Sequence, residues 1–221
     1  RNGKGLYFVA DENTEFRHLR HHDPVSGKTT VISKHIPWDV ENFTQNDDGS
    51  RIAFVSNEDG ISVLHVLDTA DYRELRLPAL PIGVVGGIEF SPDGGRLALS
   101  INTATSPTDV YVVDIAGNRL TRWTQSEVGG LDTSKFATPT LVRFKSFDGR
   151  SIPAFYYRPL GLKADERVPV LVNVHGGPAG QAQPFGPAEG PGGPGQPLDG
   201  QGVAAGQHLV VPPRADALVA G

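Results

Sequence analysis

The sequence of 221 residues contains no cysteine and no methionine. The absence of cysteine excludes disulfide bonds, thiolate metal sites and cysteine catalysis, but it leaves the cellular compartment open. No stretch approaches the roughly 18 consecutive apolar residues that a membrane-spanning helix needs. Positive charge is also scarce, since 20 Lys and Arg oppose 25 Asp and Glu for a net charge of −5. We therefore expect neither a nucleic-acid partner nor a membrane partner.

The chain has the features of an internal fragment, because it lacks methionine altogether and begins at Arg1. A signal peptide would have been lost with the true start, so the cytoplasm is favoured only slightly as the location. The length itself suits one large domain or two small ones.

A repeat of 45 residues is the strongest pattern in the N-terminal part. The segment 48–54 (Asp-Gly-Ser-Arg-Ile-Ala-Phe) matches the segment 93–99 (Asp-Gly-Gly-Arg-Leu-Ala-Leu) position for position, and residues 2–8 match the first of these 46 residues earlier. Three copies at this period are typical of propeller blades, each of which is built from four strands.

The interior of each copy predicts antiparallel strands joined by tight turns. An Asp-Gly or Asn-Gly turn requires a positive φ angle, which glycine adopts without steric cost. The strands expected after these turns are rich in β-branched residues. They cover residues 52–55, 61–67 and 74–77 in the second copy, 97–101, 109–113 and 119–123 in the third, and 29–32 in the first.

The segment Ser91-Pro92-Asp93-Gly94, followed by Asp109-Val-Tyr-Val-Val-Asp114, resembles the repeat of prolyl oligopeptidase-like and TolB-like β-propellers. Three blades cannot close a ring, because propellers have at least about four. We expect residues 1–138 to be a partial β-propeller of about three blades whose other blades lie upstream.

The composition changes near residue 139. Residues 141–147 and 151–158 read as a hairpin around Asp148-Gly149, and the apolar run Val168–Val174 reads as a buried strand of an α/β sheet. Residues 139–178 are therefore expected to begin an α/β-hydrolase domain. Beyond them, 25 of the last 43 residues are Gly, Pro or Ala. Such a segment, 179–221, is interpreted as a low-complexity tail that is disordered or read in the wrong frame.

The turn His175-Gly176-Gly177-Pro178 directly follows the predicted buried strand. Glycines in such a turn let backbone N–H groups point at a developing oxyanion, and lipases and esterases use such a turn after their third strand. The alternative is a plain turn that only ends the strand.

The order of the parts resembles the prolyl oligopeptidase family of serine peptidases, most closely its dipeptidyl-peptidase and acylaminoacyl-peptidase branch. The resemblance covers residues 1–178. It implies hydrolysis of short peptides by a Ser-His-Asp mechanism without a cofactor, with His175, Gly176 and Gly177 contributing to the oxyanion hole.

The chain departs from that family in its catalytic residues. A nucleophile elbow requires Gly-x-Ser-x-Gly, which is absent, and no Ser, Thr or Cys occurs after Ser151. The triad residues of that family therefore have no matching positions in this sequence, and we expect this chain to be inactive alone.

A non-enzymatic TolB-like binding module is the alternative function. An esterase that begins with the same hydrolase strands is a third interpretation.

Other candidate sites are weaker, and we assign no metal site. The group His18, His21, His22 and Asp23 is expected to lie on both faces of a strand rather than to bind a metal. The acidic pairs Asp11-Glu12 and Asp47-Asp48 are interpreted as solvated turn residues rather than calcium ligands. Trp38 and Trp123 are expected to pack within or between blades.

Overall fold

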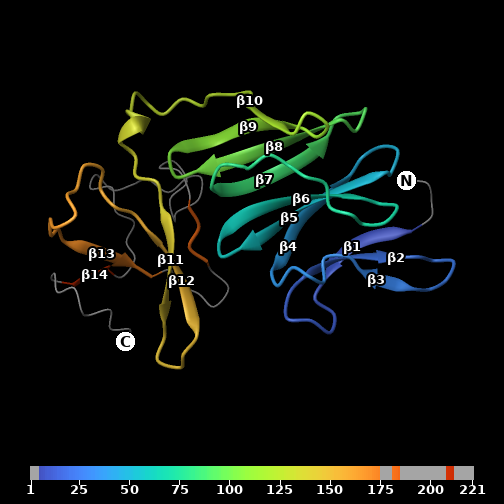
Figure 1. Ribbon diagram of the computed structural model, residues 1–221, viewed down its shortest axis with the longest axis horizontal. Helices are drawn as coiled ribbons and strands as arrows, with labels where there is room; N and C mark the ends of the chain where they lie inside the picture. The colour runs from blue at the N-terminus through green and yellow to red at the C-terminus, as the bar shows by residue number, and fades with distance from the viewer. Residues whose placement is uncertain (1–4, 175–180, 185–207, 212–221) are drawn as a thin grey trace.

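The computed structural model describes residues 5–174, 181–184 and 208–211. Strands dominate it, and they pair in antiparallel fashion throughout (Figure 1). The strands are β1 (Leu6–Ala10), β2 (His18–His22), β3 (Thr29–Val31), β4 (Asp39–Gln45), β5 (Arg51–Glu58), β6 (Ile61–Asp68), β7 (Gly83–Phe90), β8 (Arg96–Thr103), β9 (Ser106–Asp114), β10 (Arg119–Arg122), β11 (Thr140–Lys145), β12 (Ser151–Tyr156), β13 (Val170–Asn173) and β14 (His208–Val211). One 3₁₀ turn, η1 (Thr133–Lys135), is the helical element of the described residues.

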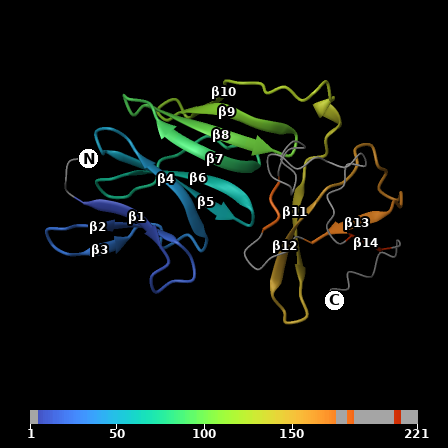
Figure 2. The same ribbon diagram turned by 180° about the vertical axis from the view of Figure 1, so that it is seen from behind.

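Three successive sheets form the N-terminal part. The first sheet has the order β1-β2-β3, the second β4-β5-β6 and the third β7-β8-β9-β10. Figures 1 and 2 show them stacked in chain order, from blue through cyan to green. The expectation of a mainly β, propeller-like part is confirmed.

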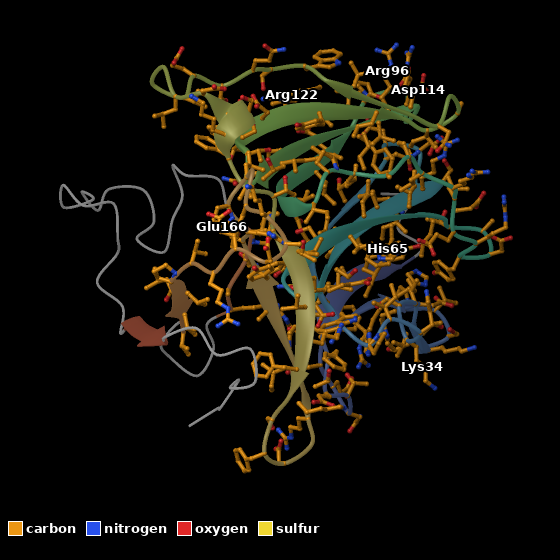
Figure 3. All side chains as sticks on the ribbon, turned by 60° about the vertical axis from the view of Figure 1, so that its left-hand side comes forward. Lys34, His65, Arg96, Asp114, Arg122 and Glu166 are labelled. Carbon is orange, nitrogen blue, oxygen red and sulfur yellow. The ribbon has the colours of Figure 1, made fainter. Side chains whose placement is uncertain are left out.

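The register of the strands reproduces the 45-residue repeat. Arg51 pairs with Asp68 at the start of the second sheet's hairpin, and Arg96 pairs with Asp114 in the third. Arg96 and Asp114 lie together at one end of the third sheet in Figure 3. A bulge interrupts β4 between residues 40 and 42, and a second one interrupts β7 between residues 85 and 87, again 45 residues later. The repeat therefore extends to backbone irregularities that the sequence pattern did not reveal.

The turns that carry the repeat have the predicted conformation. Gly49 has a φ of 75° and Gly94 a φ of 67°. In each turn the preceding aspartate accepts a backbone N–H two residues on, at 2.8 Å for Asp48 and 3.0 Å for Asp93. The pKa of each carboxyl is lowered by these hydrogen bonds and by the neighbouring serine hydroxyl.

Strand β5 is buried on both of its faces. Ile52 and Phe54 lie in a core shared with the first sheet, whereas Ala53 and Val55 lie in a core shared with the third. Because side chains alternate along a strand, this pattern requires a sheet covered on each face. The second sheet is therefore the middle layer of the stack.

The predicted strand 74–77 is wrong in all but one position. A single bridge joins Leu67 to Glu74, the N–H of Leu75 donates to the carbonyl of Val66 at 2.8 Å, and the chain then leaves the sheet. Pro78 lies three residues further on, and a proline has no N–H with which to extend a strand ladder. In the third sheet the fourth strand β10 does form, over Arg119–Arg122.

The C-terminal part contains two two-stranded antiparallel sheets, β11-β12 and β13-β14. Strands β11 and β12 pair around Gly149, which has a φ of 82°, so the first predicted hairpin is confirmed. The predicted buried strand is observed as β13, but its burial was predicted wrongly. Every residue of β13 is exposed, with Leu171 at 56%. Among the described residues the strand pairs with β14 alone, from the predicted tail, and no other described strand joins or covers this two-stranded sheet.

In the part of the chain that the structure describes, no helix is long and apolar enough to cross a membrane.

Candidate functional site

The predicted oxyanion-hole residues His175, Gly176 and Gly177 lie outside the described residues. Their role therefore stays a prediction. The described chain resumes at Gln181, and this flanking segment returns to the propeller-like sheets.

The turn between β5 and β6, residues 57–60, is the place where the two parts of the chain meet. The Nδ2 of Asn57 donates to Oε1 of Gln181 at 2.8 Å. A Cβ added to Gly60 would lie 2.7 Å from the carbonyl oxygen of Ala182 and 3.1 Å from the ring of Phe155. Glycine is required here twice, by this close approach and by its φ of 86°.

An ion pair reinforces the same junction. Arg143 of β11 pairs with Oδ2 of Asp59, whose side chain is only 8% exposed. The other carboxylate oxygen, Oδ1, is buried and has no hydrogen-bond partner among the described residues. Asp59 also has a φ of 56°, which aspartate tolerates better than most residues. The carboxylate thus depends on Arg143 for its charge compensation.

A second polar cluster crosses the second sheet, and the sequence analysis missed it. The Oγ of Ser56 lies 3.0 Å from Nε2 of His65, and Nδ1 of His65 lies 2.7 Å from Oε1 of Glu74. The carboxylate can only accept, so Nδ1 donates to Glu74, and Nε2 shares the second hydrogen bond with the hydroxyl of Ser56. This is the order of groups in a Ser-His-carboxylate triad.

The surroundings of this cluster prevent it from acting on a substrate. Ser56 is completely buried, and the ring of His65 is stacked on Phe54 with 4.7 Å between ring centroids. His65 lies inside the sheets in Figure 3. Glu58 also competes for the serine proton, with its Oε1 3.0 Å from the hydroxyl. We interpret the cluster as a structural link between β5, β6 and the chain that follows.

A third cluster surrounds Asp109, whose side chain is fully buried. It forms an ion pair with Arg122 and accepts hydrogen bonds from Thr124 at 2.7 Å and from Ser106 at 2.9 Å. Burial alone would raise the pKa of Asp109, but these hydrogen bonds together hold that pKa well below its usual range. The carboxylate ties β9 to β10 and to the chain beyond β10.

Strand β2 places the histidines of the candidate metal group in different surroundings. His18 is buried, lies 3.3 Å from the hydroxyl of Ser33, and has its pKa lowered chiefly by burial. His22 is hydrogen-bonded to Thr29 at 3.0 Å instead. Within the described residues no group of three His, Cys, Asp or Glu side chains could hold a metal ion.

The remaining candidates have structural surroundings. Glu12 of the first acidic pair lies 3.6 Å from Arg20 in an ion pair, and Asp48 of the second caps its own turn. Trp38 packs against the first core, as expected. The expectation for Trp123 is wrong, because it is 65% exposed just beyond the edge strand β10.

No protein-family model and no curated protein matches this sequence. Solved structures match its fold. Puromycin hydrolase matches with a TM-score of 0.65 and 22% identity, over 82% of this chain and 28% of that chain. Prolyl oligopeptidase B from Galerina marginata matches with a TM-score of 0.60 and 17% identity, over 74% and 24%. Dipeptidyl peptidase 4 from Porphyromonas gingivalis matches with a TM-score of 0.55 and 18% identity, over 74% and 23%.

The fold is that of the prolyl oligopeptidase enzymes. The resemblance drawn from the sequence is confirmed at this level. The chain spans about a quarter of the length of these solved structures.

The prolyl oligopeptidase fold brings together residues that no local pattern linked. Asp59 and Arg143 are 84 positions apart, and Asn57 and Gln181 are 124 apart. The Asp-Gly sequence at Asp59 is typical of a hairpin turn, but it does not indicate which residue the carboxylate pairs with. The Ser56 and His65 contact follows only once the β5–β6 register is known.

Proposed function

We propose that this chain is part of a serine-type peptidase of the prolyl oligopeptidase family, spanning the end of the propeller and the start of the peptidase domain. The complete protein would hydrolyse peptide bonds in short peptides. The observation that carries this proposal is the extent of the match to puromycin hydrolase. It covers 82% of the chain, or about 181 residues, which is more than the 138 residues of the propeller-like part.

This extent favours a peptidase over a TolB-like binding module. A propeller alone would account for residues 1–138 and leave the rest without a counterpart. The His-Gly-Gly-Pro turn at residues 175–178 supports the same choice, because a propeller has no need of it.

The proposed reaction is acyl transfer through a serine ester. The serine oxygen attacks the scissile carbonyl carbon, and a histidine takes the serine proton and passes it to the departing amine. Water then hydrolyses the acyl-enzyme and regenerates the serine. The backbone N–H groups of His175, Gly176 and Gly177 would stabilise the oxyanion of each tetrahedral intermediate.

The 221-residue chain would contribute to this reaction without performing it. It has no Gly-x-Ser-x-Gly sequence, and the buried cluster of Ser56, His65 and Glu74 is closed to substrates. Loss of a triad costs several powers of ten in rate even where an oxyanion hole persists.

The experiment that tests the proposal starts from the surrounding gene, read in all three forward frames downstream of codon 178. We expect a Gly-x-Ser-x-Gly sequence followed by an aspartate and a histidine. The complete protein should then hydrolyse dipeptide p-nitroanilides, and replacement of that serine by alanine should abolish the activity. A downstream sequence without the motif in any frame would contradict the proposal.

A further inference from the structure

The outer edge of the second sheet is incomplete along half of β6. Strand β6 pairs with β5 on one side, and on its other side only the region around Leu67 and Glu74 is covered. There the N–H of Leu75 donates to the carbonyl of Val66 at 2.8 Å, and the N–H of Asp68 donates to the carbonyl of Arg73 at 3.0 Å. Beyond Leu75 the chain runs on to β7 as a coil (Figures 1 and 2).

The alternation of an antiparallel strand identifies which backbone groups face this open edge. Asp68 and Val66 point outward, so Leu64 and Ser62 point outward as well. No backbone group of a described residue forms a hydrogen bond with the outward N–H and C=O groups of Leu64 and Ser62. Buried backbone groups of this kind normally find a partner.

The third sheet shows what fills the equivalent edge. By the 45- to 46-residue register, Val110 of β9 corresponds to Leu64 of β6. The carbonyl of Val110 accepts the N–H of Trp123 at 2.8 Å, and its N–H donates to the hydroxyl of Thr124 at 2.8 Å. The second sheet has Leu77 and Pro78 at these positions. Pro78 has neither a hydroxyl nor an N–H, and the N–H of Leu77 forms no backbone hydrogen bond with Leu64.

A cavity of about 360 Å³ occupies the place of the absent strand. Its walls are the edge residues 61–64 of β6 and the returning segment 74–82. Apolar side chains dominate the lining, and they include Ile61, Leu64, Leu75, Leu77, Leu80 and Ile82. Glu74 is the one charged residue of the lining. Its Oε1 lies 2.7 Å from Nδ1 of His65, but its side chain is 47% exposed, so the second carboxylate oxygen is left to face a ligand.

We propose that this edge binds an extended, cationic peptide segment, which adds a strand to β6 opposite Leu64 and Ser62. The peptide backbone supplies hydrogen bonds to Leu64 in place of those that Val110 of β9 makes with Trp123 and Thr124, just beyond β10. Its apolar side chains enter the cavity, and a basic side chain or amino terminus pairs with Glu74. The carboxylate at the mouth of an otherwise apolar slot favours a positive charge in the partner. This proposal is independent of the peptidase proposal and holds for any activity of the complete protein.

The test uses the 221-residue chain and the acetylated peptide Lys-Val-Thr-Val-Lys-Val-Thr-Val, labelled with fluorescein. We expect saturable binding, with the amide resonances of Leu64 and Ser62 among those that shift most on titration. The control peptide has the same side chains and charge but carries N-methyl groups on alternate residues, which removes its backbone donors. It should not bind.

Two pairs of variants locate the site. Ala79 is exposed and lines the cavity, so Ala79→Trp should fill the slot and abolish binding. Ala70 is equally exposed but outside the lining, so Ala70→Trp should bind normally. Glu74→Gln should weaken binding about 1.5- to 5-fold at low salt, which is the range of a partly exposed charge pair. Equal binding of the N-methylated peptide, absence of binding, or shifts confined to another surface would each overturn the proposal.

Discussion

Phe54 and Val55 are consecutive residues of β5, and both are fully buried, yet they lie in two different hydrophobic cores. Phe54 packs toward the first sheet and Val55 toward the third. The second sheet therefore holds its neighbours on both faces, and the N-terminal part depends on this one layer.

Truncation in either core should destabilise the fold strongly. We expect Phe54→Ala to lower the free energy of unfolding by about 3–5 kcal/mol and Leu99→Ala, on the other side, by about 2–5 kcal/mol. Leu6→Ala is the control, because Leu6 is 62% exposed and should change stability by less than about 0.5 kcal/mol. Urea denaturation measures all three. If the two cores did not both pack against the second sheet, one of the two buried variants would change the free energy of unfolding only slightly.

The Asp59–Arg143 pair should respond asymmetrically to its two single substitutions. Asp59 is buried and Arg143 is half exposed. Arg143→Ala therefore leaves a buried carboxylate without a partner, whereas Asp59→Asn leaves the arginine in contact with water. We expect Arg143→Ala to cost about 1–3 kcal/mol and Asp59→Asn clearly less. Asparagine also tolerates the positive φ at this position. The double variant should recover most of the loss, and strictly additive effects would show that the pair is not coupled.

A side chain at Gly60 should disturb the contact between the two parts of the chain. Gly60→Ala and Gly27→Ala both place a Cβ on a residue with positive φ, at 86° and 69°. Both variants should therefore lose about 1 kcal/mol of stability, because an L-residue is strained in this backbone conformation. Only Gly60 meets other atoms, at Ala182 and Phe155, whereas nothing lies within 4 Å of a Cβ at Gly27. Thermal unfolding should show a further loss of about 1–3 kcal/mol for Gly60→Ala. Equal losses for both variants would mean that the segments do not pack together in solution.

The Asp109 cluster should make stability depend on pH in the acid range. Because the pKa of Asp109 is lowered in the folded state, its contribution is complete above the ordinary carboxyl pKa of about 4 and is lost as the pH falls toward the lower value. Thr124→Val removes one hydrogen bond to the carboxylate, so the contribution of Asp109 should be smaller and its loss should be complete at a higher pH. Denaturation series from pH 7 to pH 2 compare this variant and Asp109→Asn with the unaltered chain. In Asp109→Asn the stability deficit should shrink as the pH falls, and a deficit that stays constant would contradict the assignment.

The sequence allowed the repeated turns to be predicted, because Asp48-Gly49 and Asp93-Gly94 act through local backbone geometry. The burial of β13 was not predictable, because an apolar run specifies a strand but not the layers that cover it. The strand expected at 74–77 is reduced to a bridge at Glu74, and Pro78 prevents a ladder from continuing past Leu77. The Ser56 and His65 contact and the Asp59 and Arg143 pair depend on strand register and on docking across the chain, which no single-sequence pattern contains.

Labelling with a fluorophosphonate is the most direct test of the claim that this chain supplies a scaffold and no nucleophile. The 221-residue chain would be incubated with the reagent, and its intact mass measured alongside that of Ser56→Ala. We predict no covalent adduct on either protein, because Ser56 is enclosed between β5, β6 and Glu58 and Ser33 is the one other serine that contacts a histidine among the described residues. Ser33, which does contact His18, is equally buried and should also stay unlabelled. A stoichiometric adduct, on Ser56, Ser151 or any other serine, would contradict the account.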